Sequence, residues 1–150
     1  RGGSGVIGVA QRLKTEGVKV HGMILFDAVD RAIGVDTAVI PANVERVVYA
    51  RRDPSGNSRL SFGNCGTIWR APTKCELRMF RGTHGAMGGC HWKCPPGNKP
   101  TDLIEEPFEW AGTRVSYDQD LAAAKAVWTW VQPRVSALGF LNDQLTTAYV

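Results

Sequence analysis

The apolar stretch at residues 18–26 constrains the fold more than any other segment of this chain. Lys19 and His21 are its only polar interruptions, and such a short, nearly continuous apolar run is typical of a strand buried on both faces of a parallel sheet. Residues 44–50, in which Glu45 and Arg46 precede an apolar stretch, are a second strand candidate, and turn residues follow them. Residues 75–80 are a third strand candidate. The sequence therefore predicts three strands of a mostly parallel sheet.

Helical periodicity marks two segments that flank these runs. The first is expected to be capped by Ser4 and to end at Gly17. The second begins at Ser116, which forms a capping-box pattern with Gln119, and is expected to end at Pro133. The order helix, strand, strand, strand, helix predicts an α/β domain in which helices flank the sheet.

Composition excludes several classes of protein. The chain has 150 residues, of which 43% are hydrophobic and 21% are charged, as in an ordinary globular domain. The net charge of +4 comes from basic residues that are spread along the chain, which argues against nucleic-acid binding. Apolar runs are too short for a transmembrane segment. The Gly-rich start without an initiating Met is expected of a fragment or a processed chain.

Four cysteines leave their own chemistry open. Cys90 and Cys94 have a spacing that is compatible with zinc, and Cys65 or Cys75 could complete a ligand set. Because Cys65 and Cys75 lack a short paired spacing, we expect no metal site. Disulfides and free thiols both remain open for these residues.

A single histidine lies in the glycine-rich segment FRGTHGAMGG, residues 80–89, directly after the third apolar run. Small neighbours allow the ring of His84 to face a cleft, and imidazole is suited to proton transfer near neutral pH. Loops at strand ends commonly carry the chemistry of α/β enzymes. The alternative is a tight glycine-rich turn that happens to contain a histidine.

Two aspartates follow predicted strands and are candidate acid partners for His84. Asp27 ends the first strand, although a helix cap or a pair with Arg31 would also explain it. Asp53 follows the second strand but precedes Pro54, where aspartate commonly opens a turn. We prefer Asp27, and expect it to meet His84 at the carboxyl ends of neighbouring strands.

The N-terminal segment also permits a different function. Residues 3–8, GSGVIG, match the glycine fingerprint of dinucleotide-binding folds, and Asp27 follows at the distance expected of the ribose-binding acid. In this alternative the helix N-terminus would hold a pyrophosphate.

Several segments, taken in order, resemble the serine α/β-hydrolase domain related to type VI secretion phospholipase effectors and similar uncharacterised bacterial hydrolases. That family has a G-x-S-R-G elbow, a strand ending in aromatic-Asp-Thr-Val, and a G-x-H-x-x-x-G-G histidine loop. The corresponding segments here are RGG at 1–3, LFDAV at 25–29, Asp53 with Arg59 and Phe62, and FRGTHGAMGG at 80–89. The resemblance covers residues 1 to about 115.

The resemblance implies the C-terminal portion of an α/β-hydrolase fold, with residues 1–150 forming one partial domain. Its upstream strands and nucleophilic serine would precede Arg1. His84 would then be the general base, Asp27 (or Asp53) its acid partner, and the amide of Arg1 an oxyanion-hole donor.

The implied activity is that of an esterase, lipase or phospholipase acting on a small-molecule or lipid ester without a cofactor. Arg51, Arg52 and Arg59 are candidates for binding an anionic headgroup, although such arginines more often pair with carboxylates or stay solvated. The protein would be bacterial, either cytoplasmic or a secreted effector. Besides the dinucleotide-binding alternative, a catalytically silent fragment remains possible.

Overall fold

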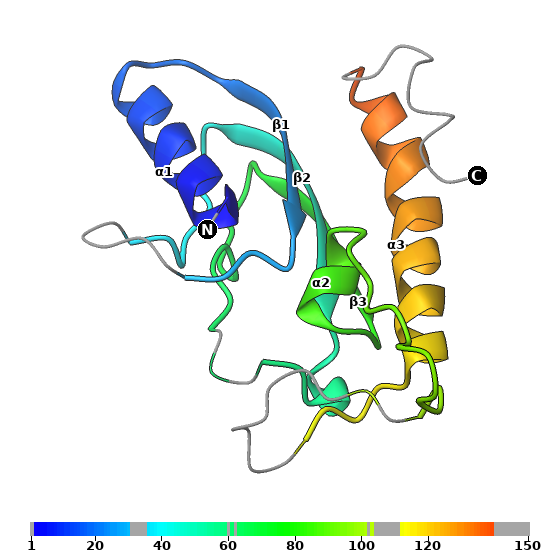
Figure 1. The fold of residues 1–150 in the computed structure, drawn as a ribbon. Coiled ribbons are helices and arrows are strands. Elements are labelled where there is room, and N and C mark those ends of the chain that lie inside the picture. The colour runs from blue at the N-terminus through cyan, green and yellow to red at the C-terminus, as the bar shows by residue number, and fades with distance from the viewer. Residues whose placement is uncertain are drawn as a thin grey trace.

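The computed structural model describes residues 2–30, 36–59, 61, 63–101, 103 and 112–139. Within these residues the chain forms a small parallel sheet between helices (Figure 1). The elements in chain order are α1 (Gly2–Thr15), β1 (Val20–Phe26), β2 (Val44–Arg52), the 3-10 helix η1 (Pro54–Gly56), β3 (Lys74–Phe80), α2 (His84–Met87) and α3 (Tyr117–Ala137).

The three strands are parallel and lie in the order β1-β2-β3. The register pairs Phe26 with Ala50, and Arg52 with Phe80, so the three strands end along one edge of the sheet. The expected α/β class with a parallel sheet is therefore confirmed. Asp27 follows β1 and His84 follows β3. The expectation that these residues follow neighbouring strands is therefore wrong, because β2 lies between β1 and β3.

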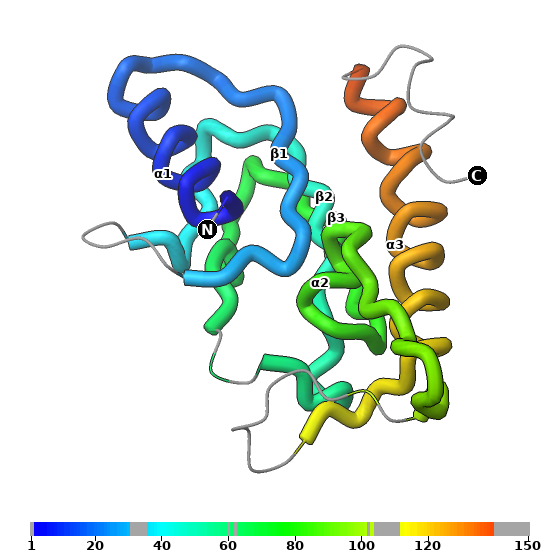
Figure 2. Tube along the Cα trace, in the orientation of Figure 1, coloured from blue at the N-terminus to red at the C-terminus, as the bar shows by residue number. Residues whose placement is uncertain are grey.

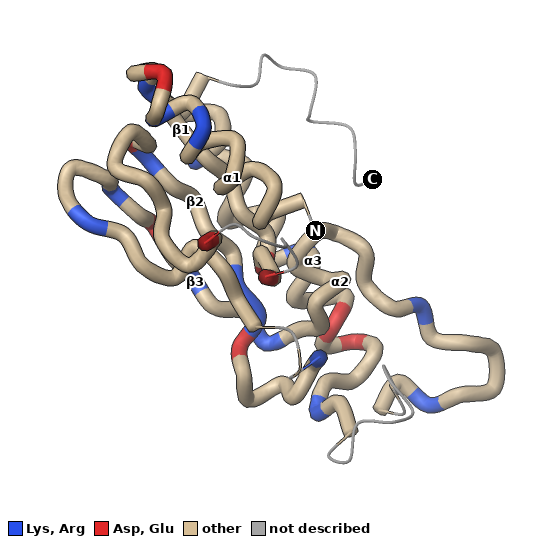
Figure 3. Tube along the Cα trace, turned by 90° about the vertical axis from the view of Figure 1, so that its left-hand side faces the viewer, with Lys and Arg blue, Asp and Glu red and all other residues tan. Residues whose placement is uncertain are grey.

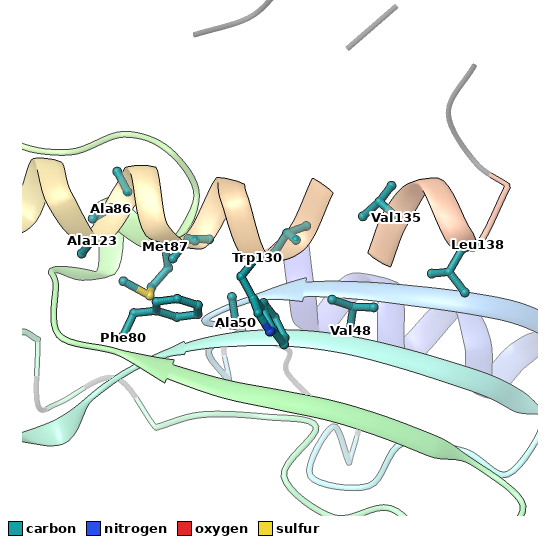
Figure 4. Close-up of a cluster of buried hydrophobic side chains, with 12 residues drawn as sticks. Val48, Ala50, Phe80, Ala86, Met87, Ala123, Trp130, Val135 and Leu138 are labelled. Atoms are coloured by element: carbon teal, nitrogen blue, oxygen red, sulfur yellow. The ribbon is translucent and has the colours of Figure 1, made fainter. Parts of the chain in front are cut away.

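Side chains of β2 divide the core into two layers. Val47 and Tyr49 pack with Ile7 and Ala10 of α1 on one face of the sheet. On the other face, β2 contributes to a cluster with α2 and α3 (Figures 1, 2 and 4).

Residues of β2 alternate between two helical layers, so this central strand is apolar on both faces. The expectation that residues 18–26 are buried on both faces of the sheet is wrong in part, because β1 is an outer strand in which Met23 and Leu25 are buried and Phe26 is 42% exposed.

The cluster beneath α3 ties this helix to the ends of β2 and β3. The rings of Phe80 and Trp130 meet edge to face, with centroids 5.8 Å apart (Figure 4). Met87 of α2 is fully buried in the same cluster. This packing fixes the position of the segment between β3 and α2, which leads directly to His84.

Helix ends differ from the sequence expectation at two positions. Ser4 lies inside α1, which begins at Gly2, so Ser4 is not its N-cap. Pro133 lies inside α3, which continues to Ala137. A proline removes one helical hydrogen bond, but Val135 and Leu138 are buried in the core beyond it, and this packing carries the helix past the proline. The capping box of Ser116 and Gln119 is present as expected.

The described residues contain no helix that is long and apolar enough to cross a membrane. Acidic and basic positions are interspersed along the described trace (Figure 3). All four cysteines are free thiols. Burial raises the pKa of Cys75 to about 11 and also raises that of Cys65, so both thiols stay protonated at neutral pH.

Candidate active site

Asp27 and His84 form a hydrogen bond at the carboxyl-terminal edge of the sheet. Asp27 directly follows β1, and His84 begins α2 shortly after β3. The His84 Nδ1 lies 2.7 Å from Asp27 Oδ2, although 57 residues separate the two in the chain. The sequence predicted Asp27 and His84 as an acid–histidine pair, and the two side chains are in contact in the structure.

Asp27 is completely buried, and its carboxylate contacts side chains of His84, Arg52 and Asn64. The Arg52 guanidinium forms an ion pair with Oδ2, the oxygen that His84 also contacts. The Asn64 amide donates to Oδ1 at 2.9 Å, and the backbone N–H of Arg52 donates to the same oxygen at 3.3 Å. Both carboxylate oxygens are therefore engaged within the protein.

These partners keep Asp27 ionised at neutral pH. Burial alone would raise the pKa of this carboxyl, but the hydrogen bond with His84, the charge of Arg52 and the Asn64 amide together hold the pKa below its usual value. A buried carboxylate is tolerated only when it is paired in this way.

The backbone of Asp27 is also unusual. Its φ of 41° lies in the left-handed region, which aspartate tolerates better than most residues. Its N–H donates to the carbonyl of Ala50 at 2.7 Å. This turn directs the side chain across the end of β2 toward His84, and such local strain is common at functional positions.

The contact with Asp27 determines the proton arrangement of His84. An ionised carboxylate only accepts hydrogen bonds, so Nδ1 carries the hydrogen and the neutral ring has its lone pair on Nε2. The side chain is 29% exposed, in contrast to Asp27. The pair can thus hold an imidazole in one tautomer and stabilise its protonated form.

A hollow beside His84 is bordered by the beginning of α1. Its lining is mostly apolar and comprises Gly2, Gly3, Val6, Ile24, Leu25, Phe26, Asp27, Ala28, Val29 and His84. A Cβ atom on Gly3 would lie 2.3 Å from the Cβ of Ala28, so only glycine allows α1 to approach the end of β1 this closely. The N-terminal end of a helix, which carries a partial positive charge, therefore lies next to the Asp27–His84 pair.

Packing requires glycine at two positions of the histidine loop, which comprises residues 80–89. A Cβ atom on Gly82 would lie 2.5 Å from the Cβ of Ala123 in α3. A Cβ atom on Gly85 would lie 2.4 Å from the carbonyl oxygen of Cys90. The loop is therefore a close-packed support for His84, and its glycines reflect this packing.

The remaining residues that the sequence singled out have other roles or lie outside the described residues. Asp53 caps η1, and its carboxylate accepts the N–H of Ser55 at 2.8 Å, a contact that lowers its pKa. Arg52 pairs with the buried carboxylate of Asp27, which is the more common role of such an arginine, and is not a headgroup-binding residue. Arg1 and Arg31 lie outside the described residues. Among the residues that the structure describes, no cluster of His, Cys, Asp or Glu could hold a metal ion.

Sequence reasoning did not assign four residues that support the pair. Arg52 and Asn64 hold Asp27, while Ser58 accepts the backbone N–H of His84 at 3.0 Å. Asp120 holds Thr83, the residue before His84. A possible signal was the position of Arg52 at the end of an apolar run, where burial of an arginine requires a carboxylate partner.

The ion pairs of Asp27 predict a loss of stability in acid. Because the folded-state pKa lies below the unfolded-state value, the stabilisation is complete above the unfolded pKa and is lost as the pH falls through the folded pKa. Urea unfolding between about pH 6 and pH 2 measures this decline. The Asp27→Asn variant should have a smaller decline, whereas Asp118→Asn, a change at an exposed position, should keep it. Equal declines in all three proteins would contradict the prediction.

No protein-family model matches this chain, and comparisons with curated proteins and with solved structures give no significant match.

Proposed function

We propose that this chain carries the acid and the histidine of a serine-dependent carboxylic ester hydrolase. The observation that supports this most strongly is the 2.7 Å contact between Asp27 and His84 at the carboxyl-terminal edge of a parallel sheet. The nucleophile would be a serine directly before Arg1. The chain order serine, aspartate, histidine is the order of α/β-hydrolases.

In this mechanism His84 Nε2 takes the proton of the serine hydroxyl as the serine oxygen attacks the ester carbonyl. The protonated imidazole then gives this proton to the departing alkoxide, which leaves as an alcohol, and an acyl-serine remains. A water molecule repeats the cycle: His84 takes its proton, the hydroxide attacks the acyl group, and the serine oxygen leaves with that proton. Asp27 stays ionised and stabilises the imidazolium.

The surroundings of α1 support a nucleophile at this place. Gly2 and Gly3 border the hollow that also contains His84, and the proposed serine would stand two positions before Gly2 in the chain. Within the described residues β1 pairs only with β2, so its other edge can take a preceding strand. The amide of Arg1 and the helix dipole of α1 would stabilise the oxyanion.

The geometry favours this function over dinucleotide binding. A ribose-binding aspartate must offer its oxygens to a ligand, whereas both Asp27 oxygens are engaged by protein groups. The residues of the glycine fingerprint lie within α1 itself. The substrate is proposed to be an ester, either a small molecule or a lipid.

Covalent labelling with a fluorophosphonate tests this proposal. We expect the gene product that includes this chain and the residues before it to be labelled, and the His84→Ala variant to lose labelling. His21→Ala, at an exposed histidine of β1, is the matched control and should label normally. Residues 1–150 alone should not be labelled, because Ser4 is only 3% exposed. Labelling at Ser4, or no labelling of the longer product, would contradict the proposal, and the second result would indicate a catalytically silent protein.

A further inference from the structure

Asp120 is a completely buried carboxylate that the proposed mechanism does not use. It lies in the first turn of α3, and its carboxylate accepts the backbone N–H of Thr83 at 2.6 Å and the Thr83 hydroxyl at 3.1 Å. It also accepts the backbone N–H of Trp92 at 2.8 Å. A single carboxylate thus fixes both sides of the segment that contains His84.

The Thr83 hydroxyl extends this arrangement into α2. Its oxygen accepts the N–H of Ala86 at 3.3 Å as the N-cap of the helix that His84 begins. Because the hydroxyl hydrogen is directed to Asp120, the oxygen lone pair is available to the helix. Asp120 therefore orients the capping group of α2 as well as the backbone before His84.

The backbone of His84 is fixed from the opposite side by Ser58. This residue is 1% exposed, and its hydroxyl oxygen accepts the His84 N–H at 3.0 Å. The N–H of Thr83 thus donates to Asp120 in α3, and the next N–H, that of His84, donates to Ser58 in the segment after β2. Close packing of Gly82 on Ala123, three residues after Asp120, holds α3 against the same loop.

We propose that Asp120 is the positioning residue of the histidine loop. Through Thr83, it sets the place and orientation of His84 relative to Asp27, without contacting the substrate. The inference rests on the proposed function only where it treats His84 as a base. Loss of hydrogen bonds to a buried charge is costly, so removing the Asp120 charge should loosen the loop before it unfolds the domain.

The downfield NMR signal of the His84 Nδ1 proton measures this directly, because the proton lies in the bond to Asp27. In Asp120→Asn we expect this signal to be lost, or its exchange with solvent to be accelerated by about tenfold or more. Asp118→Asn, on the exposed side of the same helical turn, should leave it unchanged. Circular dichroism checks that each variant is folded. A folded Asp120→Asn protein with an unchanged signal would overturn the inference.

A second pair of variants covers the case in which Asp120→Asn does not fold. Thr83→Val removes the hydroxyl but keeps the backbone N–H, and should accelerate the exchange of the His84 Nδ1 proton with solvent. Thr83→Ser keeps a hydroxyl and should exchange this proton as slowly as the unmodified protein. Equal exchange in these two proteins would also overturn the inference. Since the NMR signal needs no substrate, a failure of ester hydrolysis is distinguishable from a failure of positioning. If the longer product is a hydrolase, Asp120→Asn should lower kcat and leave KM unchanged.

Discussion

Replacing Asp27 with asparagine should reduce kcat for ester hydrolysis by about 10⁴-fold in the gene product that includes this chain. An asparagine amide can donate to His84 Nδ1, which places the imidazole hydrogen on Nε2, the nitrogen that must accept the serine proton. It also removes the charge that stabilises the imidazolium. Steady-state hydrolysis of a soluble nitrophenyl ester measures the effect.

The matched control is Asp53→Asn, because Asp53 was the competing candidate from the sequence. Its carboxylate caps η1 through Ser55, so this variant should keep the kcat of the unmodified protein. The reverse result, in which Asp53→Asn loses activity and Asp27→Asn keeps it, would assign the acid to Asp53. Equal, small effects of both changes would contradict a triad that contains either residue.

Replacing Arg52 with methionine should lower the free energy of unfolding by about 3–5 kcal/mol. The change removes the ion pair and leaves the Asp27 charge buried beside the Asn64 amide and His84. The guanidinium also donates to the carbonyl of Arg59 at 3.0 Å, and this hydrogen bond would be lost. Urea unfolding at neutral pH measures the loss, and Arg46→Met, at an exposed position of β2, is the control.

A double variant separates the ion pair from simple packing. Asp27→Asn together with Arg52→Met removes both charges, so its loss of stability should be smaller than the sum of the two single losses. Additive losses would mean that the two side chains contribute independently. The ion pair would then not be what stabilises the end of the sheet.

The pattern of the sequence determined the main elements of the fold. Short apolar segments bounded by turn residues predicted β1, β2 and β3 to within about two residues. Of the three, only the central strand β2 is largely buried. Ser116 and Gln119 predicted the start of α3 because their reciprocal bonds are local. Its end was wrong, since burial of Val135 and Leu138 outweighs the local effect of Pro133.

The sequence also identified both members of the candidate pair, because Asp27 and His84 each follow an apolar run closely. It favoured Asp27 over Asp53 but did not exclude Asp53, since both follow strands and the difference lies in what each side chain contacts in space. Arg52 and Asp120 went unrecognised for the same reason. Their partners lie 25 and 37 residues away, and nothing in the neighbouring sequence identifies these partners.

Local patterns thus determined which residues enter strands and helices, and which polar groups reach the edge of the sheet. Only the tertiary structure decided that Asp27 crosses the end of β2 to His84, that Arg52 neutralises it, and that α3 holds the histidine loop through Asp120. The physical reason is that periodicity and capping depend on near neighbours in the chain, whereas the pairing of buried charges depends on segments that meet only after the sheet has formed.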